Sequence, residues 1–259
     1  MTGKGLGAGD RVTGAIQLAA ARTGVDFGYL LNQAKVESGL NPNAKAKTSS
    51  ATGLFQFIEQ TWLATVKKHG DAHGLGWAAA SIRRGANGRF TVADPQLRRQ
   101  ILDLRRQPEA ASAMAGEFAA DNRAYLEGRL GRPVEGVDLY LAHFLGPAGA
   151  ARFLKAHDAN PDGSAAAMLP AAARANRWVF YGPGGAPRSF AQIRERFADK
   201  IGGDALPATA PRPAPGLPLD PFAVPEIRTA DLDFNRDRPA GPSPEYARLA
   251  YLMLAQLGG

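Results

Sequence analysis

The sequence contains no cysteine among its 259 residues. Thiolate catalysis, disulfide bonds and cysteine-ligated zinc sites are therefore excluded. It also lacks an apolar run of the length that crosses a bilayer, so no transmembrane segment is expected. The first fifteen residues hold no apolar stretch typical of a secretory signal peptide, and the sequence reveals no export route.

Positive charge is unevenly distributed along the chain. The net charge is +7; residues 1–203 carry a balance of +9, whereas residues 204–259 carry a balance of −2. A basic body attracts polyanions such as nucleic acid, anionic lipid surfaces or the acidic bacterial cell wall, but a solvated basic surface without a specific partner explains the charge equally well. Because no nucleic-acid recognition motif is present, we expect no nucleic-acid partner.

Apolar residues recur at helical spacing after capping residues over most of the first 203 positions. We take Asp10, Asp26, Asp94, Asp138 and Ser189 as N-caps. The expected helices begin near residue 10 and cover about 27–38, 59–69, 95–102, 108–130, 138–146, 148–157, 164–169, 171–176 and 191–201. A small hairpin is possible within the glycine-rich stretch 70–95. The predicted fold class is all-α or nearly so.

Proline marks a change of character after Gly203. Ten of the nineteen prolines lie between Pro207 and Pro244, and such a stretch favours extended backbone. We therefore divide the chain into a globular domain over 1–203, a proline-rich linker over 204–242 and a C-terminal helix over 243–259. One face of that helix is apolar, and it either docks on the domain or binds a partner or membrane surface.

Glu37 is the most informative single residue. It lies at i+7 from Leu30 and i+3 from Ala34, on the apolar face of the expected helix 27–38. A carboxyl group at the end of a buried stripe is costly to ionise, so we expect its pKa to be raised. A protonated carboxyl group is what a general acid for glycoside cleavage requires, although a glutamate that merely ends the helix fits the pattern too.

A polar residue also stands inside an apolar run a short distance further on. Gln56 is flanked by Leu54, Phe55, Phe57 and Ile58, and an amide beside a core must find hydrogen-bond partners. Either the backbone satisfies it or it lines a groove and binds polar groups of a sugar. Ser49 and Ser50 supply further hydroxyl groups in the preceding loop.

The ordered combination of these pieces resembles the soluble lytic transglycosylase (SLT) family. The resemblance rests on Glu37-Ser38, on Asn41-Pro42 with Ala44, and on Gly53-Leu54-Phe55-Gln56. The family pattern is a catalytic glutamate and serine, an N-P-x-A loop and a G-L-M-Q turn. The resemblance covers roughly residues 10–200 and is strongest over 34–62. It implies a lysozyme-like helical domain with a groove, in which Glu37 is the catalytic acid.

The chain departs from the family pattern in three places. Phe55 replaces the usual methionine, and the loop before Gly53 is one residue longer, which blurs whether Ser49 or Ser50 faces the substrate. In the later segment Ala142-His143-Phe144 stands where the family has A-Y-N. Either His143 or the neighbouring Tyr140 takes the part of the family's tyrosine, unless both are core residues. These forms are closer to a phage-type or specialised secretion-type branch.

The resemblance implies cleavage of the β-1,4 bond between N-acetylmuramic acid and N-acetylglucosamine, without cofactor, to give 1,6-anhydro ends. It also implies peptidoglycan strands as the partner and a periplasmic or extracellular location at the cell wall. Ser38, Ser49, Ser50, Phe55, Gln56, Tyr140, His143 and Phe144 are the expected substrate-binding residues. A hydrolytic goose-type lysozyme and a non-catalytic wall-binding or assembly protein remain alternatives. In the latter, residues 243–259 dock a secretion or phage structure.

Two further features concern metals and a second acid. His69 and His73 are four residues apart, but Gly70 lies between them and no acidic residue completes the set, so we expect no metal site. Most glycosidases use two carboxylates. Glu117 on the expected long helix is interpreted as structural, and a role as a second carboxylate in the groove remains an alternative.

Overall fold

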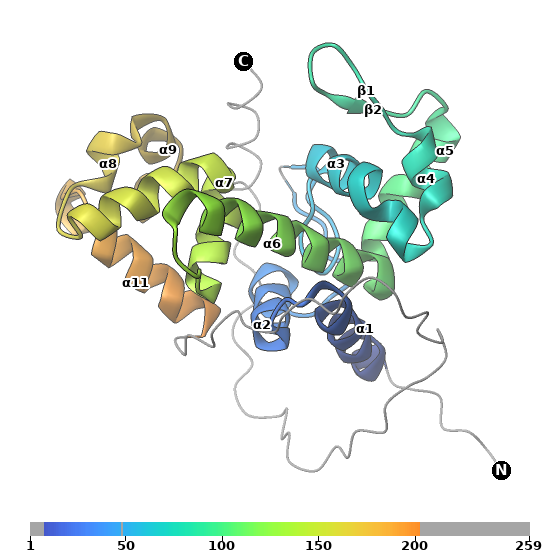
Figure 1. The fold of residues 1–259 in the computed structure, drawn as a ribbon, viewed down its shortest axis with the longest axis horizontal. Coiled ribbons are helices and arrows are strands. Elements are labelled where there is room, and N and C mark those ends of the chain that lie inside the picture. The colour runs from blue at the N-terminus through green and yellow to red at the C-terminus, as the bar shows by residue number, and fades with distance from the viewer. Residues whose placement is uncertain (1–7, 48, 203–259) are drawn as a thin grey trace.

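The computed structural model describes residues 8–47 and 49–202, and most of them are helical (Figure 1). The helices are α1 (Ala8–Thr23), α2 (Phe27–Ser38), α3 (Glu59–His69), α4 (Gly76–Ser81), α5 (Pro95–Asp103), α6 (Pro108–Leu130), α7 (Gly136–Ala159), α8 (Ala165–Met168), α9 (Pro170–Ala175), α10 (Arg177–Phe180) and α11 (Phe190–Ile201). Short 3₁₀ helices are η1 (Gly70–His73), η2 (Leu104–Arg106) and η3 (Pro183–Gly185). The predicted all-α class is confirmed.

Helix α6 forms the centre of the domain. It crosses the middle of Figure 1, with α3, α4 and α5 around its right end and α7, α8, α9 and α11 around its left end. Helices α1, α3 and α7 all pack on α6, and α11 packs on α7. The largest fully buried side chains belong to Trp62, Phe55, Phe153 and Phe180. The indole of Trp62 also donates a 2.8 Å hydrogen bond to the Ile101 carbonyl, which ties α3 to α5.

Three of the five expected N-caps are confirmed. The side chains of Asp26, Asp94 and Ser189 each accept hydrogen bonds from backbone amides of the first turn. The other two assignments were wrong. Asp10 lies inside the first turn of α1. Asp138 is the third residue of α7, where it forms a capping box with the N-cap Glu135.

Helix α7 contains the two helices expected over 138–146 and 148–157, as two segments joined at a kink. It is kinked at Gly146, whose φ of 70° and ψ of 158° are not helical. Pro147 follows directly and has no amide hydrogen to donate to the preceding turn. The expected boundary at Gly146-Pro147 is therefore confirmed as a break between two helical segments.

The hairpin considered for 70–95 is present as β1 (Arg83–Arg84) and β2 (Phe90–Thr91), which pair antiparallel. The helix α4 before it was not anticipated, because its six residues GWAAAS are too few to show a helical period.

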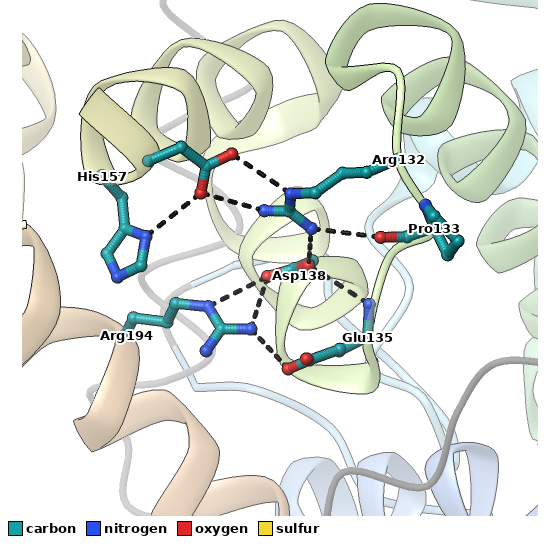
Figure 2. Close-up of polar contacts among 7 residues, drawn as sticks. Arg132, Pro133, Glu135, Asp138, His157 and Arg194 are labelled. Carbon is teal, nitrogen blue, oxygen red and sulfur yellow. Dashed lines mark hydrogen bonds and ion pairs between the residues drawn. The ribbon is translucent and has the colours of Figure 1, made fainter.

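A buried carboxylate joins the start of α7 to α11 (Figure 2). Asp138 has no exposed surface; its Oδ1 lies 3.1 Å from Arg194 and its Oδ2 lies 3.1 Å from Arg132. Arg194 also binds Glu135, and Arg132 also binds Asp158. We call these residues the Asp138 network. It fixes α11 against α7, close to the site described below.

The proline-rich linker over 204–242 and the helix over 243–259 lie outside the described residues, so their predicted structure stays a prediction. Within residues 8–47 and 49–202, the structure has no helix both long and apolar enough to cross a bilayer.

Candidate active site

Glu37 is the penultimate residue of α2, and its side chain lies in the interior with 7% of the residue exposed. Ala34 and Leu30, one and two turns earlier, have no exposed surface. The predicted apolar face is therefore confirmed. Gly39 ends the helix in the left-handed region (φ 62°), and its amide binds the carbonyls of Ala34 and Lys35.

Two residues of α7 contact one oxygen of Glu37. The hydroxyl of Tyr140 donates a 3.1 Å hydrogen bond to Oε1. The Nε2 atom of His143 lies 3.4 Å from the same oxygen. Within the described chain, Oε2 accepts no hydrogen bond from protein. One carboxylate oxygen is therefore held while the other remains available.

The proton on His143 can be assigned from its second contact. The side-chain amide nitrogen of Gln33, on α2, lies 3.4 Å from Nδ1 of His143. An amide nitrogen only donates, so this contact favours the tautomer in which Nδ1 accepts and the ring proton resides on Nε2. That proton faces Glu37.

Helix α11 supplies a cation to the same group. Lys200 donates a 2.9 Å hydrogen bond to the Tyr140 hydroxyl, whose own hydrogen then points to Glu37. Burial lowers the pKa of Lys200 to about 8, although the charge of Glu37 opposes this effect. Phe197, one turn earlier on α11, packs edge-on against the Tyr140 ring. Its ring centroid lies 4.8 Å from that of Phe144.

The pKa of Glu37 is lower than its ordinary value, which corrects the expected rise. Burial does raise the pKa, as the sequence indicated. The hydrogen bond and charge of His143, the charge of Lys200 and the hydrogen bond of Tyr140 all favour the carboxylate, and together they outweigh burial. The sequence argument failed because these three residues are more than 100 positions away from Glu37.

The candidate serines are engaged by the backbone. Ser38 Oγ donates to the carbonyl of Ala34 within α2 at 3.0 Å. Ser49 Oγ accepts from an amide two residues later, and Ser50 Oγ accepts from the amide of Glu59 at the start of α3. In this structure the three hydroxyl groups bind the backbone, and the described residues show no hydrogen bond from any of them to Glu37.

Gln56 and Phe55 also face inward. The amide nitrogen of Gln56 donates to the carbonyls of Ala44 and Gly53, at 3.2 and 2.8 Å. Its backbone adopts a positive φ of 46°, which is uncommon for a residue other than glycine. Phe55 is only 1% exposed and belongs to the core. Gln56 thus closes the loop between α2 and α3, and the described residues show no hydrogen bond from it to Glu37.

Arg105 in η2 locks this loop from outside the motif. Its guanidinium donates to the carbonyls of Ser50 and Phe57 at 2.7 and 3.0 Å, and its burial lowers its pKa to about 10. Its own carbonyl approaches Gly53 so closely that a Cβ there would lie 1.9 Å from the oxygen. Gly53 (φ 85°) is therefore required by both conformation and space.

Glu117 is occupied elsewhere. Its two oxygens lie 3.2 Å from His69 and 2.8 Å from His73, where α6 meets α3 and η1. Asp121 binds His69 as well, at 2.8 Å. The expectation that no acid accompanies the two histidines was therefore wrong. Among the described residues, however, no cluster of His, Asp and Glu has the arrangement of a metal site.

Sequence reasoning missed Gln33, Arg105 and Lys200. One signal for Lys200 was present: it is three residues after Phe197 and directly before Ile201, at the edge of the buried stripe of α11. A lysine at that boundary is normally taken as solvated. No feature of the neighbouring sequence indicates that the buried face of α11 packs against Tyr140.

Residues 14–77 match the family model of the transglycosylase SLT domain. The match runs from α1 to the start of α4 and contains Glu37 and Gln56, but Tyr140, His143 and Lys200 lie beyond it. It confirms the family resemblance seen in the sequence over this segment. It also supports a peptidoglycan-cleaving function of the transglycosylase type.

Proposed function

We propose, with the transglycosylase match over residues 14–77 as the premise, that this protein is a lytic transglycosylase that uses Glu37 as general acid and then as base. The bond that it cleaves is the β-1,4 linkage between N-acetylmuramic acid and N-acetylglucosamine. One observation carries the proposal: a buried carboxylate inside the matched segment has Oε1 held by Tyr140 and His143 and Oε2 available.

In the first step, Glu37 takes up a proton and gives it to the glycosidic oxygen as the bond from that oxygen to C1 of the muramic sugar breaks. The carbonyl oxygen of the sugar's own N-acetyl group bonds to C1, and the positive charge moves from the sugar ring onto the oxazolinium ring that forms. A second carboxylate is then unnecessary. This fits the position of Glu117, which His69 and His73 engage.

In the second step, Glu37 acts as a base. Its carboxylate removes the proton from the C6 hydroxyl, O6 bonds to C1, and the N-acetyl oxygen leaves. The product is a 1,6-anhydro sugar, and Glu37 has regained the proton with no water or cofactor consumed. The hydrogen bonds from Tyr140 and His143 stabilise the carboxylate that forms after the first proton transfer.

The lowered pKa of Glu37 has a direct consequence for activity. A lower pKa makes the protonated form a stronger acid but reduces its population at neutral pH. We therefore expect turnover to be highest on the acidic side of neutrality and to fall as the pH rises.

The remaining candidates receive supporting roles. Gln56, Ser49 and Ser50 hold the loop after α2, and Ser38 and Phe55 fix its two ends. Phe144 supports Tyr140 through Phe197. We expect these residues to act mainly by holding the loop and the Tyr140 ring in place, and to contribute less through direct contact with the sugar. Cell-wall peptidoglycan as substrate places the site of action in the periplasm or outside the cell.

The test is digestion of purified peptidoglycan sacculi, followed by mass spectrometry of the products. The wild-type chain should yield 1,6-anhydro ends, and Glu37→Gln should abolish solubilisation while retaining the helical circular dichroism spectrum. Glu59→Gln is the matched control, since it makes the same change within the matched segment at a residue paired with Arg98 on the surface.

Each other outcome has a defined meaning. Products that carry an added water would identify a hydrolytic, goose-type lysozyme. Binding to sacculi without solubilisation by the wild type would identify a wall-binding protein, for which residues 243–259 are the candidate hook to a secretion or phage assembly. Full activity of Glu37→Gln would remove Glu37 from the reaction.

A further inference from the structure

A single hydroxyl group stands between Lys200 and Glu37. The Tyr140 oxygen lies 2.9 Å from Nζ of Lys200 and 3.1 Å from Oε1 of Glu37, so three helices, α2, α7 and α11, meet at this point. We propose that Lys200 is a positioning residue that acts on Glu37 through Tyr140, by fixing the direction of the Tyr140 hydrogen and by holding the carboxylate form.

The hydrogens that each group can donate fix the direction of the two hydrogen bonds, from Lys200 to Tyr140 and from Tyr140 to Glu37. A lysine ammonium group has only hydrogens to give, so the Tyr140 oxygen must accept from it. The single hydrogen of the hydroxyl is then directed to Glu37. Donation by a cation also polarises the hydroxyl and strengthens its bond to the carboxylate. Without Lys200, the hydroxyl hydrogen of Tyr140 would no longer be fixed by a cationic donor.

The titratable groups that face Glu37 come from all of the elements packed around it. His143 and Tyr140 lie on α7, Lys200 on α11 and Tyr29 on α2 itself. Of these, Lys200 has a pKa of about 8, so its cationic form predominates at neutral pH. Arg196 on α11 faces Lys200 in turn. The cation therefore stabilises the carboxylate that proton donation leaves behind.

The fold places Lys200 with some precision. Arg194 anchors α11 to Asp138, and Phe197 packs against Tyr140 and Phe144. Lys200 follows Phe197 by three residues and so lies on the same side of the helix. The position is set by packing and by the Asp138 network, rather than by the ammonium group alone.

A rival role for Lys200 follows from an open pocket of about 290 Å³ beside the site. Its lining consists of Trp178, Arg196, Phe197, Asp199 and Lys200. If Lys200 served only to contact substrate there, its loss would raise KM and leave the titration of Glu37 unchanged. The two roles are therefore separable by experiment.

The decisive measurement is the ¹³C titration of the Glu37 carboxyl carbon in the full chain labelled at glutamate, with the signal assigned from Glu37→Gln. Lys200→Met should raise the titration midpoint of Glu37, and Lys200→Arg, which keeps a cationic donor, should restore it toward the wild-type value. Arg196→Met removes a cation one turn earlier on α11, where it packs 5.4 Å from the Trp178 ring, and should move the midpoint less. An unchanged midpoint in Lys200→Met overturns the proposal.

Kinetics on sacculi provide a second readout, which rests on the proposed function. Lys200→Met should reduce the acid-side plateau of kcat about tenfold, since a hydrogen bond from a charged donor is lost. Its fall of activity at high pH should occur at a higher pH than in the wild type, because Glu37 stays protonated longer. A uniform loss at every pH, or a change in KM alone, contradicts the positioning role. The titration needs no activity, so a failure of the proposed function does not obscure it.

Discussion

Glu37 and Asp138 are both buried carboxylates on helices, but their surroundings differ in kind. Asp138 has a cation on each oxygen, Arg194 on Oδ1 and Arg132 on Oδ2. Glu37 has both of its neighbours on Oε1, and the nearest lysine reaches it only through a tyrosine hydroxyl. A fully paired carboxylate stabilises the fold, whereas a half-paired carboxylate retains the capacity to exchange a proton.

The same amide substitution at the two positions should separate these roles most strongly. Asp138→Asn leaves Arg132 and Arg194 without their shared anion, and we expect a loss of about 2–4 kcal/mol, toward the lower part of the usual range because both arginines are partly exposed. Urea unfolding followed by circular dichroism measures it.

Glu37→Gln should cost less than about 1.5 kcal/mol in the same assay, since Tyr140 and His143 can both donate to an amide oxygen and Lys200 contacts Tyr140 rather than Glu37. The comparison fails if the two variants lose equal stability. Asp158→Asn is the surface control, because Asp158 contacts Arg132 from a position that is largely exposed to solvent.

Removing a single hydroxyl should affect catalysis more than stability. Tyr140→Phe keeps the ring against Phe197 but removes the donor to Glu37 and the acceptor for Lys200. We expect kcat on sacculi to fall about 10- to 100-fold, with a stability change near 1 kcal/mol. A variant with normal kcat would show that the contact between Tyr140 and Glu37 is structural only.

The smallest effect concerns how stability depends on pH. The pKa of Glu37 is lower in the folded protein than in the unfolded chain, so its ionised form adds stability above the unfolded pKa, and this contribution disappears as the pH falls through the folded pKa. The difference in free energy of unfolding between wild type and Glu37→Gln should therefore shrink on acidification. A difference that grows toward low pH would mean that the pKa is raised, as the sequence had suggested.

The sequence was sufficient for the features that depend on near neighbours. The burial of Glu37 follows from its spacing to Leu30 and Ala34, and the caps at Asp26, Asp94 and Ser189 follow from residues within three positions. The family match covers residues 14–77, which include Asp26 and Glu37 but not Asp94 or Ser189.

The electrostatics of the site could not be obtained in this way. The pKa direction of Glu37 depends on His143 and Lys200, which meet it only after α7 and α11 have packed together. Glu117 shows the same limit: it belongs with His69 and His73, more than forty residues earlier in the chain. Spacing identifies a carboxylate as buried, but its partners decide whether burial raises or lowers its pKa.

The location of Lys200 on α11, the last helix that the structure describes, bears on how the protein can be trimmed. A fragment cut to residues 14–77 would retain the recognisable signature and the glutamate itself, yet lose the tyrosine, the histidine and the lysine around it. Such a minimal piece would present the acid to solvent with an ordinary titration and no catalytic setting. Any transplant or truncation of this protein should therefore extend through residue 202.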